Sequence, residues 1–344
     1  MDTIARKVAE NFGGESNHLV PEANQFSLDQ VPNLTGKVAV VTGGSEGIGY
    51  GCAHTLLAHD ISKLFLLSMS SDVKDRGIAA LRDDLGDAAI QKIVWKQCDL
   101  ADWTQTGTTA LEIARETDRL DILINNAGRG VMSRQLAPTN GVELTMATNH
   151  VGHAVLTSHL LPLLKKTAEA GNVVRVVNLS SNVHESAPPE TQFASVAELN
   201  EDYNPNKLYG RSKLATLLDA KYLATHLSAT HPRILVNATH PGFVDTRQST
   251  EHILEAYPIA GHLMKEGIAP FKKDVFEGCV STMFAATVTE GTGQYICPPA
   301  IVEKGGEKAN DLQLAERLMR LTREVVEEKT RGESREKGCP FKDY

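Results

Sequence analysis

The feature that most constrains the fold is the stretch VAVVTGGSEGIG, in which a short apolar run opens into a glycine-rich turn and a helical pattern. The run from Val38 to Val41 predicts a buried strand. In the turn, Gly43 permits a tight bend, Gly47 lets the backbone approach a phosphate, and Gly49 lets the following helix pack on the strand. A strand, a glycine turn and a helix in this order predict a nucleotide-binding unit.

The rest of the sequence alternates between short apolar runs and segments in which apolar residues recur at helical spacing. Several runs are unbroken stretches of Val, Ile and Leu, which buried parallel strands require. This alternation predicts an α/β protein, a doubly wound Rossmann fold with a seven-stranded, mostly parallel sheet. The predicted strands are residues 38–42, 62–68, 92–98, 120–124, 173–179, 233–239 and 294–296. The predicted helices are residues 47–59, 73–85, 102–118, 141–167 and 207–229.

A tyrosine and a lysine in the stretch YGRSK form a candidate catalytic pair. Tyr209 and Lys213 are four residues apart, so they share one face of a helix. A free phenol loses its proton near pH ~10, and a neighbouring cation favours the phenolate and lowers that pKa. The pair is therefore a candidate proton donor and acceptor, although the same spacing also occurs by chance in surface helices.

Four further motifs follow the glycine turn in a fixed order, and the Tyr–Lys pair lies among them. They are INNAG with Asn125 to Gly128, TNHVGH with Asn149, the end of VVRVVNLSS with Ser180 and Ser181, and HPGFVDT with Pro241, Gly242 and Thr246. Together the motifs resemble the short-chain dehydrogenase/reductase family over roughly residues 35 to 300. The stretch NHVGH and the long interval between Ser181 and Tyr209 are most similar to the retinol-dehydrogenase-like and fungal reductase members.

The resemblance implies a role for each residue of a catalytic set. Tyr209 would give a proton to the oxygen of a carbonyl substrate, and Ser181, the second serine of its pair, would hydrogen-bond the same oxygen. Lys213 would lower the pKa of the tyrosine and hold the nicotinamide ribose. Asn149 would position the lysine through a water molecule. From the residues alone, Asn149 could also serve only within its helix, and the two serines could simply end a strand.

The resemblance also implies a nicotinamide cofactor bound at the carboxyl ends of the strands. The residues that it assigns to this cofactor are Gly43, Ser45, Gly47, Ile48, Gly49, Ser70, Asp99, Leu100, Asn126, Tyr209, Lys213, Pro241, Val244 and Thr246. Asp99 matches the position whose side chain reaches the adenine.

The end of the second predicted strand favours NADP as the cofactor, with NAD as the alternative. An acidic residue there binds the ribose 2′-OH of NAD, whereas basic residues accommodate the 2′-phosphate of NADP. The stretch LLSMSSDVKDR has serines at the strand end, including Ser70, and Lys74 and Arg76 follow shortly after. Glu46 in the glycine turn argues for NAD.

Composition and charge exclude several other classes of protein. With 344 residues, 41% of them hydrophobic, the chain can bury a full core. A net charge of −8 disfavours a nucleic-acid partner. Five cysteines without a CxxC pair suggest a reducing compartment. No run approaches the roughly 18 apolar residues of a membrane span, and the first residues have no apolar signal region, so a cytoplasmic protein is expected. His150 and His153 have no carboxylate or cysteine at ligand spacing, so no metal is expected.

One elaborated domain is predicted, at residues 36–305, between two extensions. Residues 1–35 are expected to form a short N-terminal arm over the domain without a catalytic role. The Pro-rich segment 183–206 and the variable segment 247–275 are expected to be loops that border the substrate. Residues 306–344 predict an amphipathic helix and a charged tail.

The predicted function is therefore NAD(P)-dependent interconversion of a carbonyl and an alcohol, on a small to medium, fairly apolar substrate such as a secondary-metabolite ketone. Two alternatives remain open. One is a regulatory protein that binds the cofactor without turnover, and the other is an enoyl reductase or epimerase on the same scaffold. The family resemblance also implies a homodimer or homotetramer that pairs through the helices at 102–118 and 141–167, unless the extensions cover them.

Overall fold

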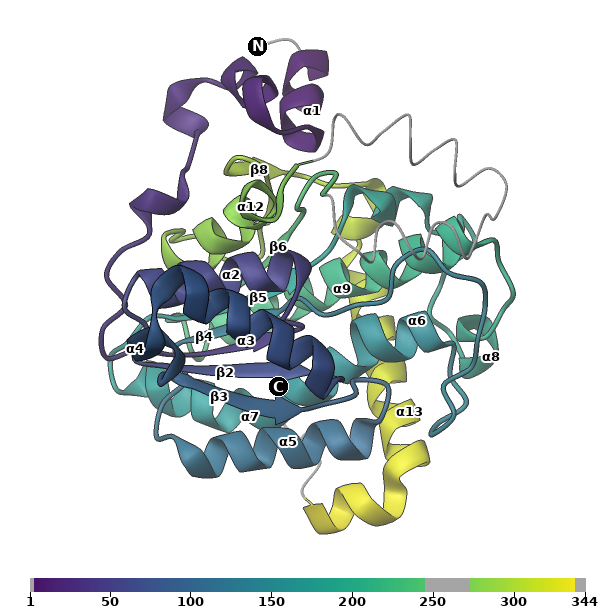
Figure 1. The fold of residues 1–344 in the computed structure, drawn as a ribbon. Coiled ribbons are helices and arrows are strands. Elements are labelled where there is room, and N and C mark those ends of the chain that lie inside the picture. The colour runs from purple at the N-terminus through teal and green to yellow at the C-terminus, as the bar shows by residue number, and fades with distance from the viewer. Residues whose placement is uncertain (1–2, 245–272, 338–344) are drawn as a thin grey trace.

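A mostly parallel sheet runs through the centre of the computed structural model, which describes residues 3–244 and 273–337 (Figure 1). Within these residues the strand order is β3-β2-β1-β4-β5-β6-β7-β8. All neighbouring pairs from β3 to β7 are parallel, and β8 is antiparallel to β7. The strands are β1 (Val38–Thr42), β2 (Lys63–Ser68), β3 (Ile93–Gln97), β4 (Ile122–Asn125), β5 (Val174–Leu179), β6 (Ile234–Thr239), β7 (Tyr295–Cys297) and β8 (Ile301–Glu303).

The predicted doubly wound α/β fold is confirmed, but the sheet has one strand more than the seven predicted. Each predicted strand is present within one or two residues of its expected bounds. The additional strand, β8, is three residues long and pairs only with β7 at the edge of the sheet. Val302 in its middle is 51% exposed. A segment this short, with an exposed apolar residue, shows no apolar pattern from which a strand could be predicted.

Helices cover both faces of the sheet and extend beyond it at both ends of the chain (Figure 1). The longer helices are α1 (Thr3–Asn11), α2 (Gly47–Ala58), α3 (Ser71–Leu85), α5 (Trp103–Glu116), α7 (His153–Glu169), α9 (Pro205–Ser228), α12 (Val275–Thr287) and α13 (Leu312–Lys337). The short helical segments are η1 (Gly14–Leu19), η2 (Glu22–Asn24), η3 (Leu28–Gln30), α4 (Asp87–Ile90), α6 (Leu144–Met146), η4 (Ala147–Gly152), η5 (Asn182–Ser186), α8 (Val196–Leu199) and η7 (Glu307–Asn310).

The helix predicted over residues 141–167 is not continuous. It begins at Leu144 and passes through a π-helical segment, η4, before α7. In this segment the carbonyl oxygen of Asn149 accepts hydrogen bonds from the side chains of His153 and Thr216. A single wide turn leaves the apolar spacing on either side nearly unchanged, so the sequence pattern does not indicate it.

Two hydrophobic cores hold the layers together. One lies between the sheet and α5, α7 and α9, and it continues to α13 through residues such as Leu318 and Val325. The other lies between the sheet and α2, α3 and α12, and it includes Phe26 and Leu34 from the N-terminal segment. Both chain extensions are therefore packed into the domain. Among the described residues, no helix is long and apolar enough to cross a membrane.

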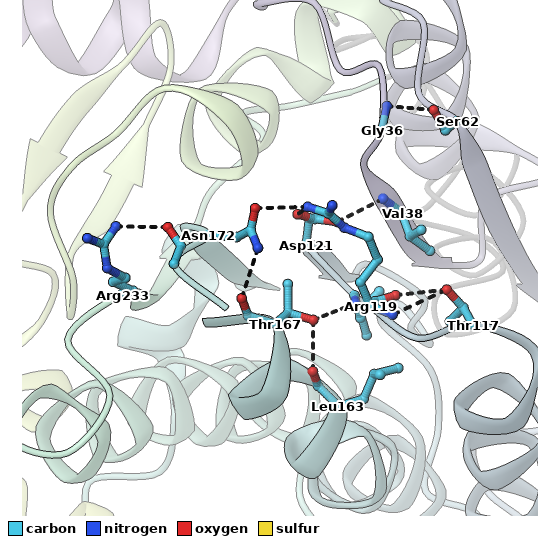
Figure 2. Close-up of polar contacts among 12 residues, drawn as sticks. Gly36, Val38, Ser62, Thr117, Arg119, Asp121, Leu163, Thr167, Asn172 and Arg233 are labelled. Carbon is cyan, nitrogen blue, oxygen red and sulfur yellow. Dashed lines mark hydrogen bonds and ion pairs between the residues drawn. The ribbon is translucent and has the colours of Figure 1, made fainter. Parts of the chain in front are cut away.

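A buried carboxylate joins the beginnings of β1 and β4, at the edge of the sheet where the strands start (Figure 2). Asp121 is 1% exposed and accepts a hydrogen bond from the backbone N–H of Val38 at 3.0 Å. Its two oxygens also bind the Arg119 guanidinium, at 2.9 and 2.5 Å. Arg119 then reaches Asn172, which precedes β5, at 3.1 Å. One side-chain network therefore sets the relative positions of three neighbouring strands.

Asp121→Ala should destabilise the protein because it leaves a buried N–H and an arginine without their acceptor. We expect the free energy of unfolding to fall by about 2–3 kcal/mol, measured by urea denaturation. The control is Asp118→Ala, because Asp118 is fully exposed and pairs with Lys166 at the surface. That change should stay within about 0.5 kcal/mol. Equal losses in the two variants would contradict the assigned role of Asp121.

Candidate active site

The glycine turn after β1 adopts a backbone conformation that depends on its glycines. Gly43 and Gly47 have φ angles of +63° and +56°, in a backbone region that residues other than glycine rarely adopt. A Cβ atom on Gly49 would lie 2.2 Å from the carbonyl oxygen of Gly43, so a larger residue could not fit there. Helix α2 begins at Gly47, and the side chain of the preceding Glu46 does not cap it. The first turn of α2 is therefore available to an anion, which suits the pyrophosphate of a dinucleotide.

The remaining residues predicted to contact the cofactor lie at the carboxyl ends of the strands. Parallel neighbouring strands end at the same edge of a sheet, so these residues share that edge with the glycine turn. Ser70 follows β2, Asp99 and Leu100 follow β3, Asn126 follows β4, and Pro241 and Val244 follow β6. Thr246 and most of the segment 247–275 lie outside the described residues.

A cluster of side chains that was not predicted from the sequence surrounds the end of β2. Trp95 on β3 donates a hydrogen bond from Nε1 to Ser68 Oγ at 2.8 Å. Ser45 in the glycine turn donates to the same oxygen at 3.3 Å. The ammonium of Lys74 lies 5.0 Å from the centroid of the Trp95 ring. The register of β3 beside β2 brings Trp95 to this position, and register cannot be read from the sequence of either strand alone.

Thr42, the last residue of β1, connects several parts of the site and was also missed. Its Oγ1 accepts hydrogen bonds from the backbone N–H groups of Asn126 and Ala127, both at 2.9 Å. The same hydroxyl lies 2.8 Å from His153 Nε2, and His153 Nδ1 lies 3.0 Å from the carbonyl oxygen of Asn149. A carbonyl only accepts, so Nδ1 carries the proton and Thr42 donates to Nε2. The hydroxyl therefore links the INNAG loop to the π-helical segment.

The two neighbouring histidines are structural in this arrangement. Burial lowers the pKa of His153 to about 4 and that of His150 to about 3, so both are neutral at pH 7. His150 Nε2 lies 2.8 Å from Thr322 Oγ1 and thereby joins η4 to α13. In the part of the chain that the structure describes, no group of three or more His, Cys, Asp or Glu could hold a metal ion.

Asn149 is 1% exposed, and its carboxamide joins the loop after β4 to helix α9. Its Oδ1 accepts from the backbone N–H of Arg129 at 2.6 Å, and its Nδ2 donates to the carbonyl oxygen of Arg129 at 2.9 Å. Nδ2 also lies 3.0 Å from Ser212 Oγ, on the residue before Lys213. The predicted positioning residue is thus hydrogen-bonded to the serine that precedes Lys213 in the chain.

Two hydrogen bonds tie the end of β5 to α9 at Lys213. Ser180 Oγ donates to the carbonyl oxygen of Lys213 at 2.8 Å. Lys213 Nζ donates to the carbonyl oxygen of Leu179 at 2.7 Å. Nζ also lies 5.6 Å from the centroid of the Tyr209 ring, so the ammonium is near the aromatic face. Helix α9 begins at Pro205, with the Asn204 side chain as its cap, which puts Tyr209 and Lys213 on the same helix as predicted.

The pKa values of this pair are shifted by burial. Burial lowers the pKa of Lys213 to about 8 and raises the pKa of Tyr209 to about 12. The shift of Tyr209 is opposite to the lowering that the spacing predicted. The reason is that removal of water from the phenolate is the dominant effect, while Nζ binds a backbone carbonyl rather than the phenol oxygen.

Ser181 lies beside α9 because Gly210 lets the backbone after it come very close. A Cβ on Gly210 would lie 2.6 Å from the carbonyl oxygen of Val183, in η5. Ser181 caps η5, since its Oγ accepts from the N–H of Val183 at 3.2 Å. His184 Nδ1 donates to the carbonyl oxygen of Ser181 at 2.6 Å. The glycine of YGRSK was not assigned a role in the sequence, although its position directly after Tyr209 is the signal for a close approach.

A buried polar chain runs behind these residues, from Asn125 through Asn178 to Asp219. Asn125 Nδ2 donates to Asn178 Oδ1 at 2.8 Å, and Asn178 Nδ2 donates to Asp219 Oδ2 at 2.9 Å. Asp219 is 2% exposed, and its Oδ1 has no hydrogen-bond partner among the described residues. Burial raises its pKa from 3.8 to about 7. An apolar helix face therefore carries a carboxyl group that is costly to ionise.

Asp219→Asn should remove this ionisation cost while keeping the shape of the side chain. The folded-state pKa is raised, so the folded protein retains a proton that the unfolded chain loses between about pH 4 and pH 7, and stability falls over that interval. Compared with wild type, the variant should gain on the order of 1–3 kcal/mol at pH 8 relative to pH 5. Urea denaturation at both pH values measures this difference.

The matched control for this prediction is Asp118→Asn, because Asp118 is fully exposed. Its stability relative to wild type should be the same at pH 5 and pH 8. If Asp219→Asn behaved in the same way as this control, the carboxyl would have to ionise without penalty in the folded protein.

Comparisons with known proteins agree with this geometry. The model of a family described as short chain dehydrogenase matches residues 37–255. The Neurospora crassa protein bli-4, named as a mitochondrial oxidoreductase, is 51% identical over 348 aligned residues that cover 100% of this chain and 84% of that protein. Human polyprenol dehydrogenase is 32% identical over 269 residues, 76% of each protein. The solved Pseudomonas aeruginosa RhlG/NADP active-site complex is 27% identical, with a TM-score of 0.58, and covers 77% of this chain and 95% of that one.

Proposed function

Because the chain belongs to the short-chain dehydrogenase family of oxidoreductases, we propose that it interconverts a carbonyl and an alcohol, with Tyr209 as proton donor and acceptor. The observation that carries the proposal is the pair of hydrogen bonds between the end of β5 and α9 at Lys213. These two bonds join the end of β5, which Ser181 follows, to the helix that bears Tyr209 and Lys213. All three side chains thus belong to segments that are bonded to each other. These segments lie at the same edge of the sheet as the glycine turn.

The proposed chemistry assigns a task to each hydroxyl. During reduction, negative charge develops on the carbonyl oxygen, so the site must supply a proton and a hydrogen-bond donor there. Tyr209 gives the proton, and Ser181 donates the hydrogen bond. Ser181 takes this role because it is the second serine of the pair, as the family motif implies, and the donation that it makes to Asn182 Oδ1 at 3.3 Å is longer than the 2.8 Å donation of Ser180 to the backbone of Lys213. When bound, a nicotinamide cofactor supplies or accepts the hydride.

The electrostatics of the pair keep the phenol protonated at neutral pH. A pKa of about 12 means that the Tyr209 proton is in place before the reaction, and its release requires stabilisation of the phenolate. A pKa of about 8 leaves Lys213 mostly cationic at pH 7, and a cation near the ring stabilises the phenolate that remains after donation. Asn149 acts as the positioning residue for Lys213, which its bond to Ser212 supports.

The proposed substrate is small to medium in size and fairly apolar, such as a secondary-metabolite ketone. Apolar side chains lie directly after the Pro241–Gly242 motif in support of this class. Phe243 is 40% exposed, and its ring centroid lies 5.6 Å from that of Phe12. The name of the human relative refers to a polyprenol, which is an apolar alcohol.

Tyr209→Phe should abolish turnover and leave cofactor affinity unchanged, because the ring is kept and only the proton donor is lost. We expect kcat to fall by about 10²- to 10⁴-fold. The test is a panel of carbonyl substrates followed at the nicotinamide absorbance, with cofactor binding measured by calorimetry. The control is Tyr203→Phe, since the Tyr203 hydroxyl donates to Glu201 at the surface. Retention of the wild-type kcat in Tyr209→Phe would refute the assignment.

We further propose that the protein prefers NADP to NAD. The hydroxyls of Ser45 and Ser68 and the Lys74 ammonium lie near the end of β2, where the fold is expected to receive the 2′ position of the adenosine ribose; Lys74 is paired here with Asp75. A basic side chain there favours a phosphate over a diol. The RhlG structure that resembles this fold is an NADP complex, which agrees with the preference.

Lys74→Ala should weaken the binding of NADPH by about tenfold and leave the affinity for NADH nearly unchanged, because only NADPH carries the phosphate that the ammonium would bind. Calorimetric titration with both cofactors measures the two values. Lys166→Ala is the control, since Lys166 is 62% exposed and lies on α7 near the opposite edge of the sheet. An equal change for both cofactors would show that Lys74 does not select the phosphate.

The two alternative functions differ from this proposal in what they require of the site. A cofactor-binding regulatory protein needs no intact catalytic set, whereas Asn149, Ser181, Tyr209 and Lys213 are all present here. An enoyl reductase or an epimerase would act at carbon, and a serine upstream of the YxxxK spacing favours carbonyl chemistry. Turnover of a ketone or aldehyde in the panel distinguishes the proposal from both alternatives.

We also propose a compartment and an oligomeric state for the protein. The four described cysteines are free thiols, which suits a reducing compartment such as the predicted cytoplasm. The bli-4 protein is named as mitochondrial, so the mitochondrial matrix is the alternative compartment. A homodimer or homotetramer that pairs through α5 and α7 would have to form beside α13, because α13 packs on α5 and α9 within the chain.

A further inference from the structure

The N-terminal helix α1 reaches the loops that surround the proposed catalytic residues. It lies outside residues 37–255, the part that the family model matches. Figure 1 shows α1 in purple next to β8 and α12, at the edge of the domain. Its last two residues are nevertheless enclosed by protein, because Glu10 is 1% exposed and Asn11 is 9% exposed. An arm that merely covered the surface would not need to bury its polar residues.

The carboxamide of Asn11 connects the loop after β5 to the loop after β6. Its Oδ1 accepts from Asn182 Nδ2 at 2.8 Å and lies 3.2 Å from His240 Nε2. His240 Nδ1 accepts from the backbone N–H of Gly242, so the ring proton is on Nε2 and the imidazole donates to Asn11. Asn11 Nδ2 donates back to the carbonyl oxygen of Lys7, which fixes the orientation of the amide. Every polar atom of this side chain therefore has a partner.

This connection leads directly to Ser181. Asn182 uses its Nδ2 to bind Asn11, which leaves its Oδ1 turned toward the serine hydroxyl. Ser181 Oγ donates to that oxygen at 3.3 Å. On the other side, His240 immediately precedes the Pro241–Gly242 motif. One amide oxygen of α1 thus holds the residue after Ser181 and the residue before Pro241 at a set separation.

The backbone of α1 binds the same loop a second time. The N–H of Phe243 donates to the carbonyl oxygen of Asn11 at 2.9 Å, and Lys273 Nζ donates to the carbonyl oxygen of Glu10 at 2.9 Å. Lys273 is 1% exposed, and its backbone N–H donates to the carbonyl oxygen of Phe243 at 2.7 Å. A cation at these last carbonyl oxygens also complements the dipole of the helix. The end of α1 and the loop after β6 therefore form one bonded unit.

We propose that α1 is part of the active site and that Asn11 is a positioning residue that sets the placement of Ser181 relative to the loop from Pro241 to Val244. The inference rests on the proposed function, because it assigns Ser181 to the substrate oxygen. It replaces the expectation that the N-terminal arm has no part in catalysis. Asn11 acts through Asn182 and His240 and need not touch the substrate itself.

The arm has other anchors, so the role of Asn11 is separable from docking of the helix. Arg6 Nε lies 2.8 Å from Glu303 Oε1 on β8, and the N–H of Gly14 donates to Glu277 on α12. Phe26 packs in the second core beyond η2. Loss of the Asn11 amide should leave these contacts in place, so the arm stays docked. The two loops then lose the bridge through Asn11 and keep the longer direct bond from the Asn182 N–H to His240 Nδ1, at 3.4 Å.

The test compares Asn11→Leu, which removes both hydrogen-bonding atoms, with Asn11→Asp, which keeps the acceptor for Asn182 and His240. Because a displacement of about 1 Å at a reacting group can cost two orders of magnitude in rate, we expect kcat of Asn11→Leu to fall by about tenfold or more. The KM for the cofactor should be unchanged, and Asn11→Asp should recover most of the rate. The matched control is Asn24→Ala, an exposed asparagine of the same arm, which should behave as wild type.

Hydrogen exchange on the same variants gives a readout that does not depend on turnover. Asn11→Leu should accelerate exchange in peptides that cover residues 181–184 and 240–244, while peptides of β1 stay unchanged. A lower melting temperature with wild-type kcat would show a merely structural role and overturn the inference. Wild-type kcat and exchange in Asn11→Leu would also overturn it.

The outcomes separate this inference from the proposed function. If the wild-type protein turned over no carbonyl or alcohol, or if Tyr209→Phe kept full activity, the proposed function would fail. Exchange at the two loops would then still decide whether Asn11 connects them. If wild type were active and Tyr209→Phe were inactive, unchanged kinetics in Asn11→Leu would refute the positioning role alone.

Discussion

The hydrogen bonds between the end of β5 and helix α9 are the interaction on which the rest of the site depends. Ser180 donates to the backbone of Lys213, and Lys213 donates back to the carbonyl oxygen of Leu179. These bonds are buried, so water does not compete for them, and they keep a strand end and a long helix in one relative position. The absence of a Cβ on Gly210 then allows the chain after Ser181 to pack against α9 beside Tyr209.

Burial also decides the electrostatics of this region. The burial that strengthens the hydrogen bonds also removes water from Tyr209, Lys213 and Asp219. The pKa of each group therefore shifts in the direction that favours its neutral form. For Tyr209 this effect exceeds any lowering by the neighbouring ammonium. The chain therefore presents a protonated phenol whose raised pKa opposes loss of the proton, next to a lysine of moderate pKa whose cationic form favours the phenolate.

The two extensions of the chain are bonded into the domain at places that matter for the site. Helix α13 fills a face of α5 and α9 and joins the π-helical segment through the bond between Thr322 and His150. Helix α1 meets the opposite end of the same site through Asn11. The residues proposed to be catalytic lie within the part that the family model matches, but the loops around them are held partly by residues outside that part.

The sequence by itself determined the α/β class, seven of the eight strands, the glycine turn and the motif residues, because apolar periodicity and glycine spacing are local properties of the chain. It did not indicate β8, the π-helical turn, the positions of Thr42 and Trp95, or the contacts of Asn11. Each of these depends on which residues from distant segments become neighbours. The direction of the pKa shift of Tyr209 was decided by the tertiary structure as well, since the spacing of Tyr209 and Lys213 gives their proximity but not how much water packing removes from them.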